Sequence, residues 1–187
     1  MSDPVVLFSG GKDSILTLKH VVEQGHDPTI LHFQTKKISD YYAKLIKRNA
    51  MRIHRTPYYY TIKTDTKNYV ACNGTSAGSY FVCLDNEEDG ELLYPRDYGC
   101  PIYIEYFKQD NKNMREGIEF MELYRPDLYR FPLKDLTQNQ IIKEWQKLPL
   151  DIKRDTISST LGWFKEFGGK TVGFKENPLE VEVSVSV

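Results

Sequence analysis

A short apolar run that ends at a pair of glycines constrains this chain more than any other feature. Residues 4–8 are apolar and do not alternate, as expected for a strand buried on both faces of a parallel sheet. Gly10 and Gly11 follow, and apolar side chains then recur at helical spacing until Gly25, a residue type that commonly ends helices. The sequence therefore predicts a strand, a tight loop and a helix in direct succession.

The loop between this strand and helix has the sequence Ser-Gly-Gly-Lys-Asp-Ser. Two adjacent glycines let the backbone bring its N–H groups close to an anion, and a helix start adds free amides and a positive dipole end. Ser9 and Ser14 add hydroxyl donors, Lys12 a mobile cation, and Asp13 a carboxylate that can hold Mg²⁺ or fix the loop. These groups predict a phosphate cradle. The Gly-x-Gly-x-x-Gly and Gly-x-x-x-x-Gly-Lys-Ser/Thr spacings are missing.

Strand and helix patterns alternate along the rest of the chain. We expect strands at residues 29–33, 51–54, 80–84 and 128–131, helices at residues 38–46, 102–123 and 137–148, and an irregular segment at residues 56–79. The last helix begins at Thr137 with the pattern of a capping box. This alternation predicts an α/β fold, in which helices cover both faces of a parallel, Rossmann-like sheet.

Composition limits the class of protein further. The chain has 187 residues, of which 40% are hydrophobic and 27% charged, the balance of a globular protein with a normal core. Apolar runs are far shorter than the about 20 residues that cross a bilayer, and the first residues lack the basic start of a signal peptide. We therefore expect a cytoplasmic protein with no membrane partner. Cys72, Cys83 and Cys100 form no CxxC pair, which predicts reduced thiols and no zinc site.

Charge gives a weaker indication of partners. The formal net charge of -1 is not that of a chain that coats nucleic acid. Basic residues nevertheless gather locally, at Lys44, Lys47, Arg48, Arg52 and Arg55. Such a cluster is usually a solvated helix face, but contact with the phosphates of a nucleotide, RNA or DNA stays open.

Residues 9–14 reproduce the Ser-Gly-Gly-x-Asp-Ser signature, and the chain thereby resembles the PP-loop ATP pyrophosphatases. The resemblance implies an adenine nucleotide α-hydrolase-like fold over residues 1–160, with ATP and Mg²⁺ as cofactors. In that family the loop binds the β- and γ-phosphates while a substrate oxygen attacks the α-phosphate. Pyrophosphate leaves, and ammonia or a sulfur donor attacks the adenylated substrate. The implied cofactor-binding residues are Phe8, Ser9, Gly10, Gly11, Lys12, Asp13, Ser14, His32 and Phe33, the last two beside the adenine.

The chain also resembles, less specifically, the 7-cyano-7-deazaguanine (preQ0) synthases. An acidic turn follows the strand expected at residues 80–84, Tyr-Pro-Arg-Asp stands at residues 94–97, and a Pro-Leu-x-x-Leu stretch begins at Pro132. This similarity implies ATP-dependent adenylation of a carboxylate or amide on a small, deazapurine-like substrate, with ammonia as the second partner. The residues expected to act are Lys12, Asp13 and Arg96 in catalysis, Asp89 and Asp97 in substrate binding, and Asp13 in magnesium binding.

Two departures keep other functions open. Those synthases carry four zinc-binding cysteines near the C-terminus, whereas this chain has no cysteine after Cys100. Lys12, at the variable position of the signature, is more similar to the sulfonucleotide reductases and tRNA-thiolation enzymes, but the reductases use a C-terminal cysteine. The alternatives are therefore a sulfur-transfer or reductase-like enzyme, and a module that binds ATP or AMP without turnover.

Residues 161–187 form an extension beyond the PP-loop domain. Gly168-Gly169-Lys170 suits a lid over the triphosphate, although a plain loop fits as well. Apolar and polar residues alternate at residues 179–187, which predicts a strand with one wet face. This strand would pair with the sheet edge or with a second copy of the chain in a homodimer.

Overall fold

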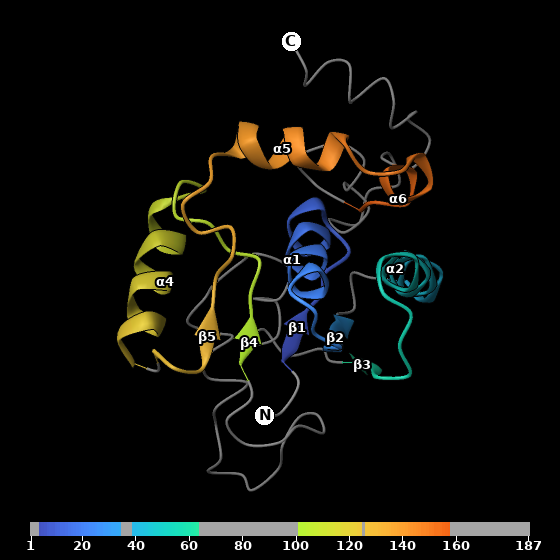
Figure 1. Ribbon diagram of the computed structural model, residues 1–187, viewed down its shortest axis with the longest axis horizontal. Coiled ribbons are helices and arrows are strands. Elements are labelled where there is room, and N and C mark those ends of the chain that lie inside the picture. The colour runs from blue at the N-terminus through green and yellow to red at the C-terminus, as the bar shows by residue number, and fades with distance from the viewer. Residues whose placement is uncertain (1–3, 35–38, 64–100, 125, 158–187) are drawn as a thin grey trace, which may run out of the picture.

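A five-stranded parallel sheet organises the protein, for which the computed structural model describes residues 4–34, 39–63, 101–124 and 126–157. The sheet order is β3-β2-β1-β4-β5 (Figure 1). The strands are β1 (Val5–Leu7), β2 (Thr29–Gln34), β3 (Tyr59–Lys63), β4 (Ile102–Tyr103) and β5 (Tyr129–Arg130). The helices are α1 (Lys12–Glu23), α2 (Asp40–Ile53), α4 (Lys112–Tyr124), α5 (Gln138–Gln146) and α6 (Leu150–Arg154). The predicted α/β class is confirmed.

Helices cover both faces of the sheet because successive strand residues point to opposite sides. Val6 and Phe8 belong to one buried cluster, together with side chains of α1, α2, α5 and α6. Val5 and Leu7 belong to a second cluster, which α4 covers. Figure 1 shows α2 and α4 on opposite sides of the molecule. A central strand that is apolar at every position is thus buried on both faces of the sheet, as its composition predicts.

The strand order fixes where a ligand site is expected. The chain leaves β1 through α1 toward β2, whereas β4 pairs with the other side of β1. The connections therefore diverge between β1 and β4, and this opens a crevice at their carboxyl ends. Open α/β sheets bind ligands at this switch point. Residues that directly follow β1 and β4 are consequently the first candidates for chemistry.

The expectation of a third strand at residues 51–54 is wrong. Met51 to Ile53 form the last turn of α2, and the strand is Tyr59–Lys63, inside the segment expected to be irregular. The helix continues because Leu45, Ile46, Asn49 and Ala50 keep one buried face through this region. Tyr59–Lys63 is rich in aromatic and β-branched residues and alternates in burial, as an edge strand with one wet face does.

The helix expected at residues 102–123 is shorter than predicted. Ile102–Tyr103 is β4, and the helix starts only at Lys112. The side chain of Asn111 accepts a hydrogen bond from the amide of Met114 at 2.8 Å, which starts the helix there. Residues 104–107 are buried and follow β4 at the switch point. They were expected to be helical, and the structure instead places them at the carboxyl end of a strand.

The other described elements follow the predictions closely. Residues 29–34 and 129–130 are strands, and α5 starts with the predicted capping box, in which Thr137 and Gln140 bond each other's amides at 3.1 and 2.8 Å. Of the helices that the structure describes, none is long and apolar enough to span a membrane. The predicted strand at residues 80–84 and the extension at residues 161–187 lie outside the described residues.

Candidate functional site

The glycine loop lies at the switch point, where β1 delivers Ser9 to the carboxyl edge of the sheet. Gly10 has a φ of +90°, a left-handed conformation that suits glycine. Gly11 is extended and caps the first turn of α1, so the chain passes from strand to helix within four residues. The amides of the first turn of α1 therefore face the same region as the loop. The predicted succession of strand, tight loop and helix is thus confirmed, while phosphate binding by the loop stays a prediction.

The loop is closed by its two serine hydroxyls. Ser14 Oγ accepts a hydrogen bond from the Gly10 amide at 3.0 Å and donates one to the Gly11 carbonyl at 3.0 Å. Ser9 Oγ accepts from the Gly11 amide at 3.3 Å and lies 3.2 Å from Ser14 Oγ. Both serines thus act on the backbone of the glycine pair. The Gly10 and Gly11 amides are therefore bonded to the serine hydroxyls, and an anion that reached these two amides would take the place of a hydroxyl.

Two segments from elsewhere in the chain lie in close contact with the two glycines. A Cβ at Gly10 would lie 2.6 Å from Ile46 Cγ1 of α2, and a Cβ at Gly11 would lie 3.3 Å from the Ile157 carbonyl. The amide of Ile157 also donates to the Gly10 carbonyl at 2.9 Å. Close approach and φ consequently both require glycine at position 10, and a side chain at position 11 would be in tight contact with the Ile157 carbonyl.

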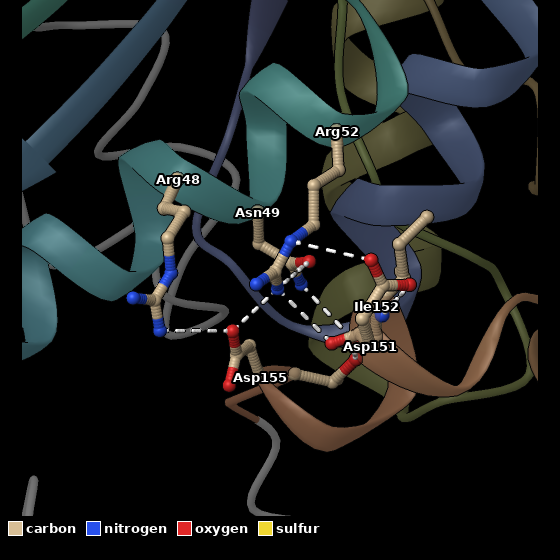
Figure 2. A network of polar contacts seen from close by, with 7 residues as sticks. Arg48, Asn49, Arg52, Asp151, Ile152 and Asp155 are labelled. Atoms are coloured by element: carbon tan, nitrogen blue, oxygen red, sulfur yellow. Dashed lines mark hydrogen bonds and ion pairs between the residues drawn. The ribbon is translucent and has the colours of Figure 1, made fainter.

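Polar contacts hold the segment that carries Ile157 (Figure 2). Arg52 of α2 pairs with Asp155 and Asp151 and also donates to the Asp151 carbonyl, while Arg48 pairs with Asp155 at 3.1 Å. Asn49 donates to the Ile152 carbonyl at 3.1 Å. We call these contacts the α2–α6 clamp. The clamp fixes α6 against α2 two residues before Ile157 reaches the loop.

A buried glutamate that the sequence analysis did not single out stands beneath the loop. Glu105 is the second residue after β4, is only 9% exposed, and has its Oε2 2.9 Å from Ser9 Oγ. Burial, and after it the charge of the neighbouring Asp13, raise the pKa of Glu105 to about 8, although the Ser9 hydrogen bond and the charge of Lys12 act in the opposite direction. Residue 105 had been assigned to a helix, so no signal placed it at the carboxyl edge.

Lys12 and Asp13 complete the charged centre of the site. Lys12 is 2% exposed and its Nζ lies 2.9 Å from Asp13 Oδ1. Burial raises the pKa of Asp13, although the charge and hydrogen bond of Lys12 act in the opposite direction. The Asp13 side chain keeps 25% of its surface exposed, so it is the carboxylate that a cation from solvent can reach. One ammonium group and two carboxyl groups thus share this centre.

His32 and Phe33 lie beside the loop but are fully buried. His32 Nδ1 donates to the Phe8 carbonyl at 2.8 Å, since a carbonyl can only accept. Burial lowers the pKa of His32 to about 4, so the ring is neutral and Nε2 is an acceptor; Nε2 has no partner within the described part of the chain. Phe33 belongs to the cluster under α4. Phe8, His32 and Phe33 therefore present almost no side-chain surface at the site.

Several predicted site residues lie outside the described residues. These are Asp89, Arg96 and Asp97, together with the three cysteines and Gly168-Gly169-Lys170. Within the described residues, no group of three or more His, Cys, Asp or Glu side chains could hold a metal ion. The structure therefore brings together the predicted loop residues and adds Glu105, while the predicted substrate contacts stay predictions.

The sequence matches no protein-family model. No curated protein is similar to it in sequence. Among solved structures, the chain is similar to one described as a predicted subunit of tRNA methyltransferase from Methanocaldococcus jannaschii. The two share 19% sequence identity with a TM-score of 0.53, over 79% of this chain and 75% of that one. At this identity the similarity establishes the fold.

A first prediction concerns Gly10. Replacing it with Ala combines a strained φ with a contact of 2.6 Å, so we expect the free energy of unfolding to fall by about 2 to 4 kcal/mol in urea titrations. Gly25→Ala is the matched control, since its φ is +88° with nothing within 4 Å, and it should cost only the backbone strain of about 1 to 2 kcal/mol. Equal losses in the two variants would show that Ile46 does not press on the loop.

A second prediction follows from the raised pKa of Glu105. Between its ordinary value of 4.5 and about 8, the folded protein binds a proton that the unfolded chain releases. Stability therefore falls as the pH rises through this window, by at most about 1.4 kcal/mol per pH unit for one group. Glu105→Gln cannot ionise and should flatten the fall in urea titrations. Glu119→Gln, exposed on α4, should keep the parent's pH dependence; identical slopes in parent and Glu105→Gln would contradict the assignment.

Proposed function

We propose that this chain binds the triphosphate of ATP in the Ser9–Ser14 loop and activates a substrate oxygen by adenylation, with release of pyrophosphate. The observation that carries the proposal is the place of the loop. A left-handed glycine turn leads into the first turn of α1 at the switch point of a 3-2-1-4-5 parallel sheet. Such a point is where open α/β sheets bind nucleotides, and a helix start is where they bind phosphate.

The donors around the loop suit a polyphosphate. Ser9 and Ser14 have hydroxyls that now bond backbone and carboxyl groups and can turn to a phosphate oxygen. The amides of the α1 start and the ammonium of Lys12 add positive charge. A triphosphate held here by its β- and γ-phosphates would leave the α-phosphate outside the loop, where a substrate can approach it.

The carboxyl groups of the site fit a magnesium ion. Asp13 is partly exposed, and Glu105 accepts a hydrogen bond from Ser9 at 2.9 Å. Carboxylate oxygens and phosphate oxygens are the ligands that Mg²⁺ prefers. A bound ion supplies charge neutralisation for the departing pyrophosphate. Asp13 would hold the ion, and Glu105 would either join it in ionised form or stay protonated and hold Ser9.

The proposed reaction has two steps. An oxygen of the substrate forms a bond to the α-phosphorus, the bond from that phosphorus to the bridging oxygen of the β-phosphate breaks, and pyrophosphate leaves with the electron pair. A nucleophile such as ammonia then attacks the carbon that carries the adenylated oxygen, the bond from this carbon to that oxygen breaks, and AMP leaves. Lys12 and the loop hydroxyls act on the first step, because negative charge grows on the pyrophosphate side. Arg96 would offset further charge on the phosphates.

The acceptor that the preQ0 synthase resemblance favours is a carboxylate or amide on a deazapurine-like ring, bound by Asp89 and Asp97. The fold similarity to a predicted subunit of a tRNA methyltransferase favours a second candidate, in which an RNA nucleoside is the acceptor. Sulfur transfer belongs to this second candidate. Both candidates share the adenylation step, and a module without turnover would lack it.

Ligand-linked stability tests the binding step. We expect ATP with Mg²⁺ at 100 times its Kd to raise the free energy of unfolding by about 2.7 kcal/mol. Ser14→Ala or Asp13→Ala should remove most of this increase in thermal-shift measurements. Ser39→Ala removes a serine that caps α2 and should keep the full increase. An unchanged ATP effect in Ser14→Ala would contradict the assignment of the loop.

Product analysis tests the chemistry. Incubation with ATP, Mg²⁺, ammonia and candidate acceptors should give AMP and pyrophosphate, measured by chromatography. Lys12→Gln should lower turnover by about 100-fold or more while changing ATP affinity less, since its contact strengthens as pyrophosphate leaves. Lys19→Gln, on the exposed side of the same helix, is the control. ADP and phosphate as products would refute the cleavage site, and no turnover with any acceptor would favour a binding module.

A further inference from the structure

A groove beside the C-terminal half of α2 carries a concentration of arginine. It has a volume of about 580 Å³ and is lined by Arg48, Met51, Arg52, Arg55, Thr56 and Pro57. Lys44, Arg48 and Arg52 follow one another at four-residue steps, so they lie on one face of the helix, and Arg55 follows just beyond its end. Lys44, Lys47, Arg48 and Arg55 are exposed. We call this surface the arginine groove.

The charges of the groove are only partly offset. Asp151 and Asp155 pair with Arg52, and Asp155 is shared with Arg48. Arg48 reaches Asp155 through Nη2 and keeps 57% of its side chain exposed. Arg55 forms no ion pair with any residue that the structure describes. Arg52 thus makes most of the contacts of the α2–α6 clamp, whereas Arg48 joins the clamp through Nη2 alone and, like Arg55, is exposed to solvent.

The position of the groove decides what kind of anion it suits. A helix C-terminus presents carbonyl groups and the negative end of the dipole, so a small phosphate ion gains nothing from the backbone there. Attraction must come from exposed side chains, which favour a polyanion because each phosphate that they neutralise releases counterions. Arginine is well suited to this contact, since its planar fork bonds phosphate oxygens in pairs.

We propose that the arginine groove binds the phosphate backbone of a nucleic-acid strand. Arg48 and Arg55 contact successive phosphates, and Lys44 and Lys47 extend the basic surface along α2. Tyr58 follows the lining residue Pro57 and is 48% exposed, so its ring offers a stacking face for a base. The binding is independent of whether the Ser9–Ser14 loop turns over ATP, because no loop residue lines the groove.

Fluorescence anisotropy with a labelled single-stranded RNA of about 20 nucleotides, at about 50 and 200 mM salt, tests this proposal. The parent should bind and lose affinity with salt. The double variant Arg48→Gln, Arg55→Gln should bind about 10-fold or more weakly and reduce the slope of log K against log salt by about 1 to 2. Arg52 is left in place so that its contacts with Asp151 and Asp155 keep the clamp together after Arg48 is replaced, and thermal unfolding checks the fold of each variant.

The control removes the same charge elsewhere. Lys112→Gln with Arg115→Gln lies on exposed α4, on the other face of the sheet, and should change RNA affinity less than about 2-fold. Failure of the parent to bind, or equal losses in the two double variants, would overturn the proposal.

Displacement of the RNA by ATP or inorganic phosphate at matched ionic strength would instead assign the groove to a small anion. Displacement by polyglutamate at equal charge would assign it to an acidic protein segment. ATP-induced stabilisation is measured separately and should persist in both double variants.

Discussion

The close approach of Ile46 and Ile157 to the glycine pair determines the geometry of the candidate site. Gly10 can hold its left-handed turn only where no Cβ is present, and the space that a Cβ would occupy is filled by Ile46 of α2. The Gly10 carbonyl is bonded by the Ile157 amide. These neighbours lie far from the loop in sequence, so the loop reaches its shape only when α2 and the segment after α6 have packed. A local motif is thus completed by tertiary structure.

If the loop binds a nucleotide as proposed, the charges around it require that a cation or a proton be bound as well. Lys12 is one positive charge beside the two carboxyl groups of Asp13 and Glu105; Lys12 and Glu105 are buried, and Asp13 is partly exposed. A triphosphate adds several negative charges to this centre. Burial already raises the pKa of Glu105 to about 8, so at neutral pH this group is mostly protonated and adds little repulsion. Asp13, which solvent reaches, stays the natural position for a divalent ion.

The sequence predicted the parts of the structure that local rules govern. Local patterns in the sequence predicted the apolar run of β1, the glycine loop, the apolar stripe of α1 and the capping box at Thr137. Together these elements predicted the α/β class. The sequence did not predict Glu105. Ile102–Tyr103 is a strand of two residues, too short for a period to show, and the helical stripe of α4 extended across it. The third strand was predicted at the wrong place for a related reason: a short run with apolar residues such as Met51 and Ile53 fits the end of a helix as well as a strand.

The two proposed anion-binding surfaces lie at opposite ends of neighbouring helices, and this accounts for the different groups that line them. The start of α1 supplies backbone amides, which suit one compact phosphate group. The end of α2 supplies no free amides, so binding there depends on arginines. The segment at residues 151–157 touches both surfaces, through Asp155 and through Ile157. Arg52 and Asn49 hold this segment without help from Arg48, and Trp145 donates a further hydrogen bond to Thr156 at 3.0 Å. A nucleic-acid strand that drew Arg48 away from Asp155, as proposed, would therefore leave Ile157 on the glycine loop, and the two proposed surfaces could then be occupied together.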